Sequence, residues 1–363
     1  MSRIHNFSSG PSCLPEEVLR EIRDEMLDWH GSGMSVLEMP FSCPEYRAIA
    51  AAAERDLRAL LDVPASHHIL FLQGGAYAHF GILAMNLLAP GRGADYVVTG
   101  LWSERAAAEA GRHGNVRIAA SGAREGFCGI PPRESWQLDP AAAYCHLTTN
   151  ETAHGVQFRE LPDTGAVPLV ADVTSDFLMQ PIEVARCGLL YASAQKNAGC
   201  AGLTIVIVRE DMLRGAAGVT PAAFDYRRQA ECNGCVNTPP TFSVYCAGLM
   251  FAWMRRNGGV ATFAQHAARR SARLYEVIDG SPLYLCPVEP AHRSQVNLCF
   301  RLPSGELERE FLDEAARRGL HHLEGHSAVG GVRVSLHNAT PDSSVEALLA
   351  FMRDFAARRQ AAA

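Results

Sequence analysis

Short apolar runs alternate with amphipathic segments along most of this chain. The apolar runs predict strands at 69–72, 96–99, 143–147, 167–171, 188–192 and 203–208. Apolar residues that recur every three or four positions predict helices at 15–28, where Val18, Ile22 and Met26 share one face, and at 45–61 and 103–111. Strands that alternate with helices imply a largely parallel sheet that is covered on both faces. We therefore expect an α/β fold.

The pattern changes after the polar stretch at 255–259. A long helix is predicted at 260–278, followed by a strand at 296–301, a helix at 306–318, a strand at 331–335 and a helix at 344–358. This order is typical of a smaller α+β domain. The sequence thus predicts a large domain at 1–255, which includes the N-terminal segment, and a small C-terminal domain at 256–363.

Composition and charge exclude several classes of protein. With 363 residues, 48% of them hydrophobic, the chain can bury a sizeable core. A net charge of -6 argues against nucleic acid or an anionic membrane as the main partner. No apolar run approaches the roughly 20 residues that span a bilayer, and the N-terminus lacks a signal-peptide core, so we expect a cytoplasmic protein. The eleven cysteines include one CxxC pair, Cys232 and Cys235, which we interpret as loop thiols and not as a metal site.

Several residues that could bind a ligand lie just past the ends of the predicted strands. They are Gln73, Trp102, the segment 148–152, Asp172 and Lys196. Ligands of parallel α/β sheets bind beyond the carboxyl ends of the strands, so these side chains are expected to form one site. A carboxylate and a lysine at such ends are what a pyridoxal phosphate (PLP) enzyme needs. The lysine forms a Schiff base with the cofactor aldehyde, and the carboxylate keeps the pyridine nitrogen protonated.

Each of these motifs also has an ordinary structural explanation. The Gly74–Gly75 turn before a helix suits a phosphate but is equally typical of any strand-to-helix turn. Trp102 could stack on a ring or fill the core, and the loop 237–241 could bind phosphate or simply start a helix. Lys196 is the most telling residue, because a lysine between apolar strands is unusual unless its amine is used or paired.

The motifs together resemble the phosphoserine aminotransferase family, within the class V branch of fold-type I PLP enzymes. The resemblance runs nearly end to end, through segments 6–11, 172–178, 194–197, 201–204, 237–242 and 330–335. It implies PLP as cofactor and a homodimer with active sites at the subunit interface. It also implies Lys196 as the Schiff-base lysine, Asp172 at the pyridine nitrogen, Trp102 on the ring and Thr152 at the phenolic oxygen. By the same resemblance Ala76, Tyr77 and Gln195 hold the cofactor phosphate, Asn237 and Thr238 arrive from the other subunit, and Arg333 binds the substrate α-carboxylate.

The chain departs from this family where the family binds the substrate phosphate. Phe41 and Ser42 stand where the family has a His-Arg pair, Tyr77 replaces an arginine, and Ser327 replaces an arginine beside the retained His326. We therefore expect a ping-pong aminotransferase whose substrate is not phosphorylated, with a neutral, polar or partly aromatic side chain, in a specialised biosynthetic pathway. The alternatives are phosphoserine transamination in serine biosynthesis, using 3-phosphohydroxypyruvate and L-glutamate, and a PLP lyase or decarboxylase. A non-catalytic binding protein is a further alternative, against which the intact set of cofactor residues argues.

Overall fold

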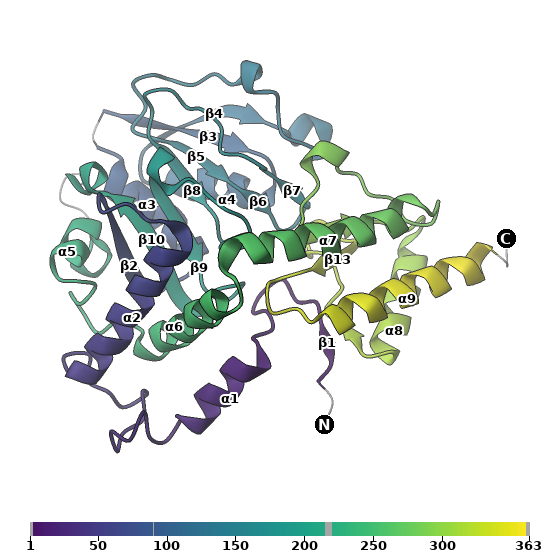
Figure 1. Ribbon diagram of the computed structural model, residues 1–363. Coiled ribbons are helices and arrows are strands. Elements are labelled where there is room, and N and C mark those ends of the chain that lie inside the picture. Colours follow the sequence, from purple (N-terminus) through teal and green to yellow (C-terminus); the bar gives the residue numbers. More distant parts are fainter. Residues whose placement is uncertain (1–2, 90, 215–219, 361–363) are drawn as a thin grey trace.

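A seven-stranded sheet forms the centre of the computed structural model, which describes residues 3–89, 91–214 and 220–360 (Figure 1). The strand order is β2-β10-β9-β8-β5-β3-β4. The strands are β2 (His67–Gly74), β3 (Gly93–Val98), β4 (Asn115–Ser121), β5 (Cys145–Thr148), β8 (Leu169–Asp172), β9 (Cys187–Ser193) and β10 (Gly202–Arg209). Only β10 runs against its neighbours, so the carboxyl ends of the other six strands lie at one edge.

Helices cover both faces of this sheet, which explains why its strands are continuous apolar runs. On β10, Leu203, Ile205 and Ile207 belong to the core beneath α2 (Pro44–Leu61) and α6 (Thr241–Arg256). The alternate residues, Val206 and Val208, belong to the core beneath α3 (Ala76–Leu87) and α4 (Leu101–Ala110). The remaining elements of this half are α1 (Glu16–Asp24), α5 (Tyr226–Glu231) and the small pair β6 (Asn150–Glu151) and β7 (Val156–Gln157).

A separate core lies in the C-terminal part of the chain. It is built from α7 (Gly259–Asp279), α8 (Gly305–Arg317), α9 (Asp342–Gln360), β12 (Leu320–His321) and the antiparallel pair β11 (Asn297–Phe300) and β13 (Val332–Ser335). The N-terminal strand β1 (His5–Asn6) pairs with β12, and Phe7 is buried in this second core. In Figure 1, α7 runs from the sheet toward α9, and its buried residues are shared between the two cores.

The structure confirms the six predicted strands of the sheet and its largely parallel character. The helix predicted at 15–28 is shorter and ends at Asp24. Strand β4 was not predicted, because four of its seven residues are exposed at the sheet edge and its apolar signal is weak. Within the described ranges, no helix is both long and apolar enough to cross a membrane. Cys232 is exposed and Cys235 half-buried, and all eleven cysteines are free thiols.

We expect Phe311→Ala to destabilise the C-terminal core strongly. Phe311 is fully buried, and its ring lies 4.9–6.1 Å from those of Tyr284, Phe300, Phe351 and Phe355. Removing such a ring costs about 3–5 kcal/mol, because transfer and cavity terms add. Urea unfolding, monitored by circular dichroism, measures the loss in the free energy of unfolding. Leu27→Ala is the matched control, since Leu27 is 86% exposed and its truncation should change stability by less than about 0.5 kcal/mol.

Candidate active site

Lys196 lies just beyond β9, and its amine is desolvated. Its Nζ donates a hydrogen bond to Thr152 Oγ1 at 2.5 Å and lies 5.9 Å from the ring centre of Trp102. Burial lowers the pKa of Lys196 to about 8, against the opposing effect of Asp172. The amine is therefore far more often neutral near pH 7 than an ordinary lysine, and only a neutral amine is a nucleophile.

Lys196 is also the only lysine in the whole sequence. The chain has 33 basic Lys and Arg residues, and all the others are arginines. An arginine serves as well as a lysine on the surface, but it keeps its proton in proteins and cannot act as a nucleophile or a base. The one lysine of the chain thus occupies a position whose surroundings favour loss of the proton from its amine.

Asp172 ends β8, next to β9 in the sheet. Its side chain is buried, one oxygen accepts a hydrogen bond from the Thr174 backbone N–H at 2.9 Å, and burial raises its pKa. A buried carboxylate is stabilised by a cationic hydrogen-bond donor. A protonated pyridine nitrogen is such a donor.

Trp102 is held in place by a buried glutamate. Glu151, at the end of β6, accepts hydrogen bonds from the backbone N–H groups of Trp102 at 3.0 Å and Ser103 at 2.8 Å, and from Ser103 Oγ at 2.6 Å. This carboxylate satisfies free amides at the N-terminus of α4, as a capping side chain does. Gly100 makes the approach possible, because a Cβ there would lie 2.6 Å from Glu151 Cδ. The neighbouring Thr152 contacts Lys196, so one short strand positions both Trp102 and the amine.

Segments from both ends of the chain fix the backbone around Lys196. The Ser12 N–H donates to Gln195 O at 2.9 Å, and Ser12 Oγ donates to Lys196 O. On the other side, the Asn338 N–H donates to Asn197 Oδ1 at 3.0 Å. The lysine loop is therefore tied to the N-terminal segment and to the loop after β13.

The N-terminus of α3 meets the same loop. Gly75 precedes Ala76, and a Cβ at Gly75 would lie 3.3 Å from Ser193 Oγ. Ser193 Oγ in turn donates a hydrogen bond to Gln195 Oε1. Ala76 and Gln195 are thus brought together at a helix N-terminus, whose free amides and dipole suit a phosphate. Tyr77 is 58% exposed, and its ring lies 5.7 Å from that of Phe80.

Two buried donors in this region, Trp102 Nε1 and Arg333 Nε, lack a partner among the described residues. His337 Nε2 donates to Ser9 O, so the buried Nδ1 of this neutral ring is an acceptor, and it too has no partner there. Burial lowers the pKa of His337, and the positive charges of Lys196 and Arg333 lower it further. Burial also lowers the pKa of Lys196, and the charge of Arg333 adds to that effect, so the three groups lie near one another. Buried donors without acceptors are costly, which indicates that a ligand completes their hydrogen bonds. Together with Asp172 and the α3 N-terminus, they fit PLP and an amino acid carboxylate.

Other residues named from the sequence lie outside this cluster. Phe41 and Ser42 line a separate pocket of about 510 Å³ with Arg47 and Cys235. Asn237 and Thr238 contact Gln229 and Gln73, respectively. Ser327 is exposed beside His326, whose ring lies 5.7 Å from that of Trp102.

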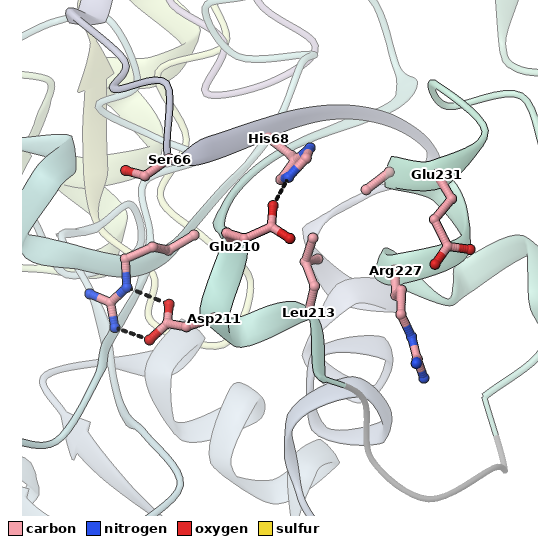
Figure 2. A pocket seen from close by; sticks show the side chains of 9 residues that line it. Ser66, His68, Glu210, Asp211, Leu213, Arg227 and Glu231 are labelled. Atoms are coloured by element: carbon pink, nitrogen blue, oxygen red, sulfur yellow. Dashed lines mark hydrogen bonds and ion pairs between the residues drawn. The ribbon is translucent and has the colours of Figure 1, made fainter.

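A further surface pocket, of about 720 Å³, lies at the opposite end of β2 and β10 (Figure 2). Its charged residues are largely paired with one another. Arg209 binds both carboxylate oxygens of Asp211, and His68 bonds Glu210. This pocket has no part in the lysine site.

We expect Glu151→Ala to loosen the start of α4 and to displace Trp102. Loss of a buried cap leaves two or more amides unsatisfied, which costs about 1–3 kcal/mol. Thermal unfolding should show a lower midpoint, and near-UV circular dichroism a weaker tryptophan signal. Glu104→Ala, which removes an exposed carboxylate from the same helical turn, is the control. An unchanged tryptophan signal in Glu151→Ala would contradict the positioning role.

Comparison with known proteins identifies the family. Residues 4–348 match the model of the class V aminotransferases. The chain is 51% identical to the phosphoserine aminotransferase of Laribacter hongkongensis over 356 residues, which cover 98% of this chain and 99% of that one. It is also 51% identical to the enzyme of the same name from Burkholderia ambifaria over 357 residues, with the same coverage of both chains.

Solved structures agree with this assignment. Phosphoserine aminotransferase from Bacillus circulans superposes with a TM-score of 0.96 at 40% identity, over 98% of this chain and 99% of that one. The PLP-bound phosphoserine aminotransferase from Trichomonas vaginalis superposes with a TM-score of 0.92 at 35% identity, over 97% of this chain and 100% of that one. The fold is that of the PLP-dependent aminotransferases, and the chain belongs to the class V aminotransferases as a transaminase with PLP as its cofactor.

Proposed function

We propose that this aminotransferase exchanges an amino group between an amino acid and a 2-oxo acid whose distal group is not a phosphate. The observation that supports this is the chemistry of four positions: Phe41, Ser42, Tyr77 and Ser327. None of these side chains carries a positive charge. A dianionic phosphate would therefore receive no guanidinium from these four positions, and Arg47, which lines the pocket of Phe41 and Ser42, is the arginine of that pocket nearest to them in the sequence.

The loss of these arginines is expected to lower the affinity for a substrate phosphate by a large factor. A hydrogen bond to a charged group contributes roughly 1.5–3 kcal/mol, so three missing arginines would cost on the order of 4–9 kcal/mol. That corresponds to about 10³- to 10⁶-fold in affinity. Such terms are not additive, and Arg47, which lines the pocket of Phe41 and Ser42, is a guanidinium that could offset part of the loss.

The roles proposed for the remaining residues are those that the family resemblance implies, and the positions of Lys196, Asp172 and Trp102 support them. PLP, when bound, supplies an electron sink for the bonds at the substrate Cα. Lys196 Nζ, which is neutral far more often than an ordinary lysine amine, binds the cofactor and later carries the Cα proton. Asp172 holds the proton of the pyridine nitrogen, Trp102 covers the ring, and Thr152 orients the amine. Ala76, Tyr77 and Gln195 bind the cofactor phosphate, and Arg333 pairs with the substrate α-carboxylate.

The active unit in this proposal is a cytoplasmic homodimer. Phe41 and Ser42 line a pocket whose lining does not include Lys196, and the loop of Asn237 and Thr238 lies beside Gln73. A second subunit would supply these residues to the site. The large and small domains, 1–255 and 256–363, remain a prediction, which the two separate hydrophobic cores support.

Phosphoserine transamination is the second candidate. Identity of 51% over nearly the whole chain to enzymes of that name favours it. In that case, residues other than the four substituted positions would have to bind the phosphate.

A single-turnover experiment distinguishes the two candidate functions. PLP-loaded enzyme is mixed with O-phospho-L-serine, L-glutamate and a panel of unphosphorylated amino acids, and the absorbance of the cofactor is followed. We expect slow or absent conversion with phosphoserine and rapid conversion with an unphosphorylated amino acid. Ser42→Arg combined with Tyr77→Arg should raise the rate with phosphoserine, whereas Leu27→Arg, at an exposed site, should not. Rapid conversion of phosphoserine by the wild type would overturn the proposal.

The pKa of Lys196 gives a separate test that needs no substrate. In protein stripped of PLP, brief acetylation should modify Lys196 with a rate that rises through a midpoint near pH 8 and levels off above it, because the neutral amine reacts. Mass spectrometry of the peptide that contains Lys196 measures the extent of acetylation. Lys196→Arg leaves the chain without any lysine and is the blank. A midpoint near the ordinary value for lysine, about 10.4, would contradict the desolvated site.

A further inference from the structure

Cys200 and Cys246 are two thiols to which the transamination chemistry gives no role. Cys200 lies four residues after Lys196, in the loop that leads into β10, and Cys246 lies on α6. Both are free thiols, and Cys200 is half-buried whereas Cys246 is only 2% exposed. The pair therefore combines one sulfur that solvent reaches with one that it does not.

The loop of Cys200 lies directly on α6. A Cβ at Gly199 would lie 3.6 Å from the carbonyl carbon of Cys246, so the two backbones are in close contact. Ser243 Oγ donates a hydrogen bond to Ala201 O at 3.3 Å, and Cys200 Sγ lies 3.4 Å from the same Ser243 Oγ. Ser243 and Cys246 are three residues apart on one face of the helix, which places Cys200 Sγ beside both side chains.

The two thiols differ in acidity. The Cys246 S–H donates a hydrogen bond to the Cys200 sulfur, which lowers the pKa of Cys200 to about 6 against the opposing effect of burial. The same hydrogen bond, together with burial, raises the pKa of Cys246. Near pH 7, Cys200 is therefore largely a thiolate, the nucleophilic form, while Cys246 keeps its proton. At Cys187, which lies outside the pair, burial instead raises the pKa of the thiol to about 12.

We propose that Cys200 and Cys246 are an oxidant-responsive modification site, which a small hydroperoxide converts to a disulfide. The Cys200 thiolate attacks the terminal hydroxyl oxygen, the O–O bond breaks, and hydroxide or an alkoxide leaves, so that Cys200 becomes a sulfenic acid. The Cys246 sulfur then attacks the Cys200 sulfur and forms the S–S bond, while its proton and the departing hydroxide combine to water. The two sulfurs supply the two electrons that reduce the peroxide. An accessible thiolate beside a resolving thiol is the arrangement typical of redox-sensitive cysteines.

The disulfide would protect the loop that carries Lys196. A sulfenic acid that meets more peroxide is oxidised further to a sulfinic acid, which ordinary thiols do not reduce. Capture by Cys246 stops the oxidation at a disulfide, which a dithiol reductant reverses. Because the loop and the helix are already in contact, the bond should form without displacing Lys196. This role does not depend on which amino acids the enzyme exchanges.

Peroxide treatment of the reduced, PLP-loaded enzyme tests the site. After catalase has removed the hydrogen peroxide, free thiols are blocked by alkylation, and the protein is cleaved at arginine without reduction. We expect the peptide that contains Cys200 to be linked to peptide 229–255. Fragmentation should place the bond at Cys246 and not at Cys232 or Cys235, which lie in the same peptide. Dithiothreitol should separate the two peptides.

Two variants of Cys246 separate its two roles. Cys246→Ser keeps a hydrogen-bond donor but cannot form the disulfide, so Cys200 should accumulate sulfenic acid, which dimedone traps, and then sulfinic acid. Cys246→Ala also removes the donor, and the pH midpoint for alkylation of Cys200 should rise from about 6 toward the ordinary value of about 8.5. Cys232→Ala, at an exposed thiol, is the control and should form the same disulfide as the wild type.

Either of two results would overturn this inference. One is oxidation of Cys200 to sulfinic acid in the wild type without any link to Cys246. The other is oxidation of an exposed thiol such as Cys232 while Cys200 stays reduced. Both measurements use the wild-type enzyme, so they decide the question even where a variant fails to fold.

Discussion

Desolvation of one amine is the constraint on which the site depends. The Lys196 amine can be neutral near pH 7 only because water is kept from it, and the exclusion is achieved by segments from all parts of the chain. The N-terminal segment, Thr152 just after β6 and the loop after β13 each contact the lysine or its neighbours. Because these contacts join the sheet to the C-terminal core, the packing of the two cores also holds the residues around Lys196 in place.

The carboxyl edge of the sheet explains how distant residues converge. Lys196, Asp172 and Trp102 follow β9, β8 and β3, three strands that run in the same direction. Glu151 then links two of these positions, since its carboxylate orients Trp102 and its neighbour Thr152 contacts the amine. A charge that is buried and fully hydrogen-bonded is rigid, which suits a residue that must hold a flat ring in place.

The sequence predicted those parts of the structure that local pattern controls. Buried strands are apolar runs, and the residues that follow them were recognisable as a site. Strand β4 and helices α5 and α6 were not predicted, because the first is largely exposed and the others follow a polar loop. Glu151 lay within the predicted segment 148–152, but its role could not be recognised, and neither could those of Ser12 and Asn338, since their partners are far away in the sequence.

The use of arginine at every basic position but one has a chemical consequence for the loading of the enzyme. Aldehydes condense with exposed lysine amines, so an ordinary lysine-rich surface competes with the active site for pyridoxal phosphate. Guanidinium groups do not compete in this way, because they stay protonated. In this chain the only side-chain amine is Lys196. Each chain therefore presents a single side chain able to capture the cofactor, and the amount of cofactor bound through a side-chain amine directly counts intact active sites.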